Sequence, residues 1–126
     1  MERVMAKILV IDDEEQLRDL LKQMLTRDGH EVQTAYDGVE GIRCFNNFHP
    51  DIVITDIIMP NKDGIEVITE LLCRDSKIAI IAISGGRRAI TAEFNLESAE
   101  LLGVKGILSK PFTREQLRET IQLALV

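Results

Sequence analysis

Two patterns of apolar residues alternate strictly along this chain, one typical of a β-strand and the other of an amphipathic helix. The strand patterns fall at residues 7–11, 31–36, 51–55, 77–83 and 105–108. Each is followed by a segment long enough for a helix, the usual crossover between parallel strands. The alternation therefore predicts an α/β fold of five βα units around a mainly parallel sheet.

The first three helices have recognisable ends. The first is expected at residues 14–28, with Gly29 in the position of a C-cap. Its apolar residues recur at i, i+3, i+4, i+7 and i+8, as on one helix face: Leu17, Leu20, Leu21, Met24 and Leu25. A second helix should close before His49-Pro50, and a third should cover residues 65–74.

The last two helices differ in how clearly the sequence marks them. Within residues 85–103 the helical spacing is clearest at Leu96, Ala99 and Leu102. The final helix has a distinct start, because Thr113 and Gln116 form a capping-box pattern. Its expected buried stripe consists of Leu117, Ile121, Ala124 and Leu125.

Strand composition predicts the order of the sheet. Residues 7–11, 51–55 and 77–83 are nearly continuous aliphatic runs, as expected for parallel strands covered on both faces. Residues 31–36 and 105–108 are mixed and suit the two edges. We therefore expect a doubly wound, five-stranded parallel sheet in the order 2-1-3-4-5, within one domain over residues 1–126.

The composition of the chain argues against several classes of function. The formal net charge of -6 and the absence of tryptophan disfavour direct binding of nucleic acid. No apolar run approaches the ~20 residues of a membrane span, and the N-terminus lacks a signal-peptide pattern, so we expect no membrane association and a cytoplasmic location. Cys44 and Cys73 have no CxxC pairing and are expected to be buried, reduced thiols.

Polar residues gather where the predicted strands end. In chain order they are Asp12, Asp13, Glu14, Asp56, Ser84 and Lys110. Ligands of an open parallel sheet bind outside the carboxyl ends of the strands, where the strand order reverses. Here that point lies between the first and third strands, which would be neighbours ~4.8 Å apart. We therefore expect Asp12, Asp13 and Asp56 to share one pocket.

This acidic cluster has the chemistry of a metal site. Three crowded carboxylates repel one another, and a divalent cation among them relieves the repulsion. Because all the ligands are oxygens, with no His or Cys, Mg²⁺ is favoured over zinc or copper. Asp12 or Asp13 alone could instead cap the first helix. A cap does not account for both residues together with Asp56.

Lys110 and Ser84 extend the candidate site. Lys110 follows an edge strand and precedes a proline, so it is aimed at the acidic pocket, although in isolation it could be a solvated surface lysine. Ser84 precedes Gly85-Gly86 and could be a turn residue, or its hydroxyl could bind an oxyanion. Mg²⁺, a lysine and a hydroxyl around one carboxylate suit phosphoryl transfer with that carboxylate as nucleophile.

These residues resemble the receiver (phosphoacceptor) domain of two-component response regulators over essentially the whole chain. The motifs that carry the resemblance are ILVIDDE at residues 8–14, DIVITDIIMP at 51–60 with Asp63-Gly64, ISG at 83–85 and KPF at 110–112. The resemblance implies a flavodoxin-like (βα)5 fold. It also implies a role in two-component signalling.

The resemblance assigns a role to each site residue. Asp56 would accept a phosphoryl group from a phosphohistidine on a histidine kinase or phosphotransfer protein. Lys110 would contact the phosphoryl oxygens, the Ser84 hydroxyl would bond one of them, and the Lys110-Pro111 bond would be cis. The ligands of Mg²⁺ would be Asp13, Asp56, the backbone carbonyl of Ile58 and, through water, Asp12.

The chain departs from the family pattern at several positions. Ile107 stands where the family usually has an aromatic residue on the fifth strand, so we expect switching to depend on rearrangement of a loop or of the helix within residues 85–103. Arg87 and Arg88 lie in a longer connection and are either solvated or a partner contact. Neither Ile58 nor Gly86 can orient a water molecule, which predicts slow hydrolysis of phosphorylated Asp56.

The expected function is that of a stand-alone response regulator without external substrate turnover. Phosphorylation would change the face formed by the fourth helix and fifth strand, which would then bind a downstream signalling protein, or the chain would pass the phosphoryl group on. One alternative is a receiver-like interaction module that works without phosphorylation. A less favoured one is a Mg-dependent aspartyl phosphatase, which would need a second aspartate at Ile58.

Overall fold

The chain folds around a parallel β-sheet. The computed structural model describes residues 6–57, 64–84, 97 and 101–125. The sheet has five strands in the order β2-β1-β3-β4-β5, and every pairing is parallel. The strands are β1 (Lys7–Ile11), β2 (Glu31–Ala35), β3 (Ile52–Asp56), β4 (Ala79–Ser84) and β5 (Gly106–Ser109). The predicted fold class and strand order are confirmed, and strand ends shift by only one or two residues.

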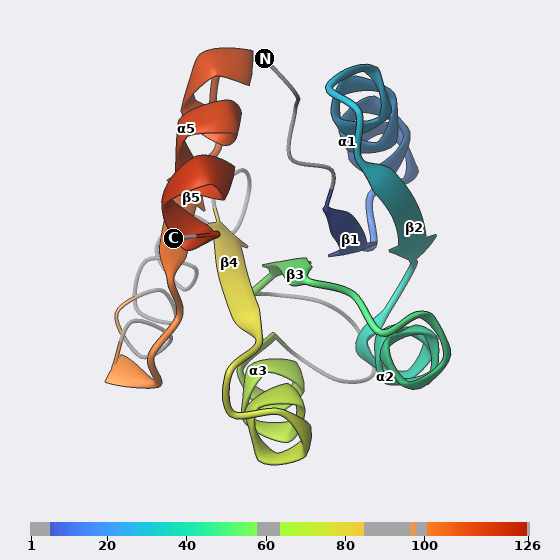
Figure 1. Cartoon of the computed structure of the whole chain (residues 1–126), viewed down its shortest axis with the longest axis vertical. Helices are drawn as coiled ribbons and strands as arrows, with labels where there is room; N and C mark the ends of the chain where they lie inside the picture. The colour runs from blue at the N-terminus through green and yellow to red at the C-terminus, as the bar shows by residue number, and fades with distance from the viewer. Residues whose placement is uncertain (1–5, 58–63, 85–96, 98–100, 126) are drawn as a thin grey trace.

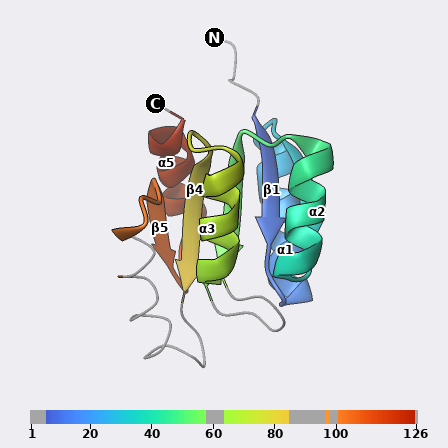
Figure 2. The ribbon, with the colours of Figure 1, turned by 90° about the horizontal axis from the view of Figure 1, so that it is seen from below.

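Helices cover both faces of the sheet (Figure 1). Helices α1 (Glu15–Arg27) and α5 (Arg114–Ala124) pack on one face, and α2 (Gly38–Phe48) and α3 (Gly64–Arg74) pack on the other. All strands point to the same edge of the sheet, as the side view in Figure 2 shows. Most of the helix predicted within residues 85–103 lies outside the described residues.

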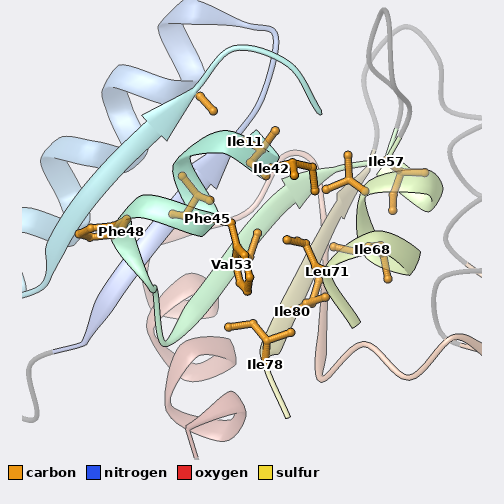
Figure 3. Packing of buried hydrophobic residues seen from close by; sticks show 14 residues of the cluster. Ile11, Ile42, Phe45, Phe48, Val53, Ile57, Ile68, Leu71, Ile78 and Ile80 are labelled. Atoms are coloured by element: carbon orange, nitrogen blue, oxygen red, sulfur yellow. The ribbon is translucent and has the colours of Figure 1, made fainter. Parts of the chain in front are cut away.

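Strand side chains alternate between the two helical layers. In β1, Leu9 and Ile11 belong to the apolar cluster beneath α2 and α3, whereas Ile8 and Val10 belong to the cluster beneath α1 and α5. All four are fully buried, which explains why the central strands are continuous aliphatic runs. Figure 3 shows the first cluster, in which helix residues meet the strands: Ile42, Phe45, Phe48, Ile68 and Leu71.

Two predicted helix ends are present as local hydrogen-bonding motifs. The hydroxyl of Thr113 accepts a bond from the Gln116 N–H at 3.0 Å, and the Thr113 N–H donates to the Gln116 side chain at 2.8 Å. This is the predicted capping box at the start of α5. Gly29 follows α1 with a φ of 94°, a left-handed conformation that favours glycine.

The predicted burial of Leu125 and Cys73 is wrong, that of Cys44 is only partly correct, and Leu20 on the apolar face of α1 is exposed as well. Leu20 is 51% exposed, because it lies at the margin of the α1 stripe and the sheet covers only its centre. Leu125 is exposed because α5 ends one residue before it. Cys73 is also exposed, near the end of α3, whereas Cys44 is half-buried against the α2–α3 cluster. Both cysteines are free thiols, as expected.

Across the described ranges, no helix combines the length and apolar content that a bilayer span requires.

Candidate functional site

Three carboxylates meet at the carboxyl edge of the sheet. Asp12 and Asp13 directly follow β1, and Asp56 is the last residue of β3. The two strands are paired, with Ile11 opposite Thr55, so the register brings the residues after β1 beside the end of β3. One oxygen of each carboxylate lies within 4.8 Å of the others. The predicted convergence of these three aspartates is therefore observed.

Asp12 is the most deeply buried of the three. Its side chain is 1% exposed, and its Oδ1 accepts a hydrogen bond from the backbone N–H of Glu14 at 2.8 Å. Among the described atoms its Oδ2 accepts no hydrogen bond. Burial, reinforced by the charge of Asp56, raises the pKa of Asp12 to about 7. A buried carboxylate oxygen in this position is costly unless a proton or a cation satisfies it.

The alternative role of Asp12 or Asp13 as a helix cap is not observed. The N-cap position of α1 belongs to Glu14, whose side chain makes no capping hydrogen bond. The Arg18 guanidinium on α1 donates instead to the backbone carbonyl of Asp12 at 2.9 Å. This contact ties the first turn of α1 to the loop that carries the acidic pair.

Lys110 brings a positive charge into the same pocket. Its Nζ lies 3.1 Å from Asp56 Oδ2, 3.1 Å from Glu14 Oε1 and 3.7 Å from Asp12 Oδ2. Burial by itself lowers the pKa of Lys110, but the charges of Asp12 and Asp56 and the two hydrogen bonds outweigh it and raise the pKa above 10.5. The lysine is therefore held as an ammonium ion. The Lys110-Pro111 bond is cis, as the resemblance implied.

The pocket fits a hard divalent cation. Its donor set is three carboxylates whose oxygens are close enough to share one ion, and one buried oxygen of Asp12 has no hydrogen bond. The absence of histidine and thiol ligands from this cluster matches the oxygen preference of Mg²⁺. Asp12, Asp13 and Asp56 could therefore hold a Mg²⁺ ion.

Of the remaining predicted site residues, Ser84 is described only by its backbone, and Ile58 is not described. Ser84 is the last residue of β4, the strand next to β3, and Ile83 lies opposite Asp56 in the register. The backbone of Ser84 therefore ends at the same edge as the acidic cluster. Its hydroxyl and the whole of Ile58 lie outside the described residues, as do Gly86, Arg87 and Arg88.

Sequence reasoning gave no role to two residues that shape the site. Gly64, the first residue of α3, packs so closely on the end of β3 that an added Cβ would clash with the carbonyl oxygen of Asp56 and with the Cα of Ile57. Glu14 is the second, through its hydrogen bond to Lys110. The Asp63-Gly64 pair in the sequence could have indicated the role of Gly64. The role of Glu14 depends on a contact with a residue far away in the sequence.

A parallel sheet with a charged pocket at its carboxyl edge defines a doubly wound α/β domain with its site at the switch point of the strand order. The family model for the response regulator receiver domain matches residues 8–122. This chain therefore belongs to the response regulator receiver domain family.

Similar proteins agree with this assignment. The chain is 33% identical over 118 residues to the chemotaxis protein CheY of Halobacterium salinarum, covering 93% of this chain and 95% of that protein. It is 32% identical over 119 residues to the alkaline phosphatase synthesis transcriptional regulatory protein PhoP of Bacillus subtilis, covering 94% of this chain but 48% of PhoP. A solved receiver domain protein from Clostridium thermocellum superposes with a TM-score of 0.87 at 35% identity, covering 95% and 94% of the two chains.

Family membership sets the general function. Receiver domains are signalling modules of two-component systems that interact with histidine kinases and downstream effectors. Phosphorylation and Mg²⁺ binding at an acidic pocket are standard for the family. The aspartate cluster at the ends of β1 and β3 is an acidic pocket of this kind.

Proposed function

We propose that this chain accepts a phosphoryl group on Asp56 from a histidine kinase or a histidine phosphotransfer protein. The observation that carries the proposal is the contact of Lys110 Nζ with Asp56 Oδ2 at 3.1 Å, beside the buried carboxylate of Asp12. Asp56 is 6% exposed, and the carboxylates of Asp12 and Asp13 lie beside it. The family match over residues 8–122 supports treating residues 1–126 as one receiver domain.

The residues present can carry the transfer without a further base. A carboxylate oxygen of Asp56 attacks the phosphorus, the bond from phosphorus to the donor imidazole breaks, and the imidazole nitrogen keeps the electron pair. The charge on the phosphoryl oxygens is stabilised by the ammonium group of Lys110. When bound by Asp12, Asp13 and Asp56, with the carbonyl of Ile58, Mg²⁺ would neutralise the carboxylates and the incoming phosphate.

The phosphoryl group would change the charge of the pocket and thereby the output face. It adds negative charge beside Lys110, which follows β5, and the Ser84 hydroxyl at the end of β4 would bond one of its oxygens. Ile107 on β5 is half-buried and lines an open pocket of about 400 Å³ together with Phe112 and Thr120. We propose that a downstream signalling protein binds at the face formed by the fourth helix and β5, or that the phosphoryl group is passed on.

Incubation with acetyl phosphate and Mg²⁺, followed by intact-mass measurement, tests the proposal. We expect a phosphoryl adduct on the unaltered protein that is absent in Asp56→Asn and absent when EDTA replaces Mg²⁺. Asp19→Asn is the matched control, because Asp19 is an exposed aspartate of α1 and should leave the adduct unchanged. Absence of an adduct on the unaltered protein would favour a module that works without phosphorylation.

We further propose that phosphorylated Asp56 hydrolyses slowly. The proposal rests on residue types alone, because the side chains of Ile58 and Gly86 cannot hold a water molecule by hydrogen bonds. Release of labelled phosphate from the purified phosphoprotein should accelerate in Ile58→Asn and Gly86→Glu. Equal lifetimes in all three proteins would reject it.

A further inference from the structure

Glu14 makes the least buried contact of the Lys110 ammonium group. Its Oε1 lies 3.1 Å from Lys110 Nζ, although 96 residues separate the two in sequence. The Glu14 side chain is 62% exposed, whereas the side chains of Asp12 and Asp56 are 1% and 9% exposed. The three carboxylates that surround the lysine therefore differ sharply in how freely they can move.

Lys110 already has three carboxylate partners, two of which accept hydrogen bonds from it. An ammonium group has three N–H donors. Two hydrogen bonds go to Glu14 and Asp56, and Asp12 Oδ2 forms an ion pair at 3.7 Å. A phosphoryl group on Asp56 brings new oxygens to the same cation, and these oxygens compete with its present carboxylate partners.

Glu14 is the partner that can leave most easily. Asp12 is fixed by burial and by the hydrogen bond from the backbone N–H of Glu14, and Asp56 is fixed in β3. The carboxylate of Glu14 can turn into water with little loss, because exposed ion pairs contribute only about 0.2–1 kcal/mol. Its negative charge also repels an anionic phosphoryl group that approaches Lys110.

We propose that Glu14 is a positioning residue that binds Lys110 before phosphorylation and competes with the phosphoryl group for it. This inference rests on the proposed function of Asp56 as phosphoacceptor. Its consequence is that Glu14 slows the reaction: removing its charge leaves Lys110 free for the phosphoryl oxygens. We expect Glu14→Gln to be phosphorylated about 2- to 5-fold faster, the fold-change that corresponds to an exposed ion pair.

The first test compares rates of phosphorylation by acetyl phosphate with Mg²⁺ in the unaltered protein, Glu14→Gln and Glu15→Gln. Glu15 is the matched control, an exposed neighbour in the first turn of α1 whose substitution changes the net charge equally. We expect acceleration in Glu14→Gln alone, and we expect salt to reduce it because screening weakens exposed pairs. A rate equal to that of Glu15→Gln, or an acceleration that salt leaves unchanged, would overturn the proposal.

A second test needs neither metal nor phosphoryl donor. In the Mg²⁺-free protein, the ¹⁵N-edited NMR signal of the Lys110 ammonium group should shift and exchange faster with water in Glu14→Gln, and stay unchanged in Glu15→Gln. An unchanged Lys110 signal in Glu14→Gln would reject the role of Glu14. If the unaltered protein accepted no phosphoryl group, the proposed function would be wrong. The NMR signal of Lys110 would still show whether Glu14 binds Lys110.

Discussion

The ammonium nitrogen of Lys110 lies 3.1 Å from Oδ2 of Asp56, although 54 residues separate the two in sequence. Parallel pairing explains the contact: β3 and β5 flank β4, and all three strands end at the same edge of the sheet. A cation and a nucleophilic carboxylate are thus brought together by topology. The account of the function depends on this pair.

Replacing Lys110 with methionine should lower the rate of phosphorylation by acetyl phosphate about 10²-fold or more, as expected when a group that stabilises developing charge is lost. Methionine keeps much of the length of the side chain but removes the charge. Lys105→Met is the control, because Lys105 is an exposed lysine just before β5 and its loss changes the net charge equally. Equal rates in the two variants would show that Lys110 does not act on the phosphoryl group.

The buried charge of Asp12 should make the Mg²⁺-free protein less stable as the pH rises. The pKa of Asp12 is about 7 in the folded chain, whereas its ordinary value, which applies to the unfolded chain, is 3.8. Between these two pH values the folded state holds a proton that the unfolded state lacks. The free energy of unfolding should therefore fall from pH 4 to pH 7 and then level off. Asp12→Asn should remove this pH dependence. At pH 8 its free energy of unfolding should be about 1–3 kcal/mol higher than that of the unaltered protein.

Urea unfolding in EDTA at pH 5 and pH 8 measures this effect. The difference in the free energy of unfolding between Asp12→Asn and the unaltered protein should be larger at pH 8 than at pH 5, and Mg²⁺ should reduce it by stabilising the unaltered protein. A gap of equal size at both pH values would contradict the raised pKa of Asp12. Failure of Mg²⁺ to stabilise the unaltered protein would contradict the metal site.

The ion pairs of Asp28 should stabilise the packing of α1 against α5. Arg118 on α5 donates two hydrogen bonds to the Asp28 carboxylate, at 2.7 and 3.0 Å, and Arg114 donates a third at 3.2 Å. These hydrogen bonds lower the pKa of Asp28 to about 2, and those from Arg118 have the largest effect. Because both arginines are half exposed, solvent screening limits the stabilisation to about 1 kcal/mol.

A carboxylate with a lowered pKa stabilises the fold above its unfolded pKa of 3.8 and loses that effect as the pH falls towards 2. Asp28→Asn should therefore reduce the free energy of unfolding at pH 7 and have a smaller effect at pH 3. Urea unfolding at the two pH values checks the difference, with Asp19→Asn as an exposed control on the same helix. A loss at pH 3 as large as at pH 7 would argue against the ion pairs.

Gly64→Ala should disturb the site through the backbone. An added Cβ would meet the carbonyl oxygen of Asp56 and the Cα of Ile57, neither of which can turn aside as a side chain could. We expect a loss of about 1–3 kcal/mol in the free energy of unfolding and slower phosphorylation. Gly41→Ala is the comparison, because the three atoms nearest to its Cβ would all belong to the side chain of Ile11. Equal losses in both variants would contradict this explanation.

The sequence predicted the sheet and much of the site, because both follow from periodicity and from where strands end. Asp12, Asp13, Asp56 and Lys110 could be placed together once the strand order was known. The exposure of Leu20 could not be predicted, because helical spacing does not reveal how much of the stripe the sheet covers. The contact of Glu14 with Lys110 was missed because it depends on side-chain reach across the pocket.

Chemical location of the phosphoryl group would show whether Asp56 is the phosphoacceptor. The protein would be treated with acetyl phosphate and Mg²⁺, reduced with borohydride, which converts an aspartyl phosphate to homoserine, and digested for mass spectrometry. The account predicts homoserine at position 56, and none at Asp12 or Asp13 on the same surface. Modification at either of those residues, or at no aspartate at all, would contradict it.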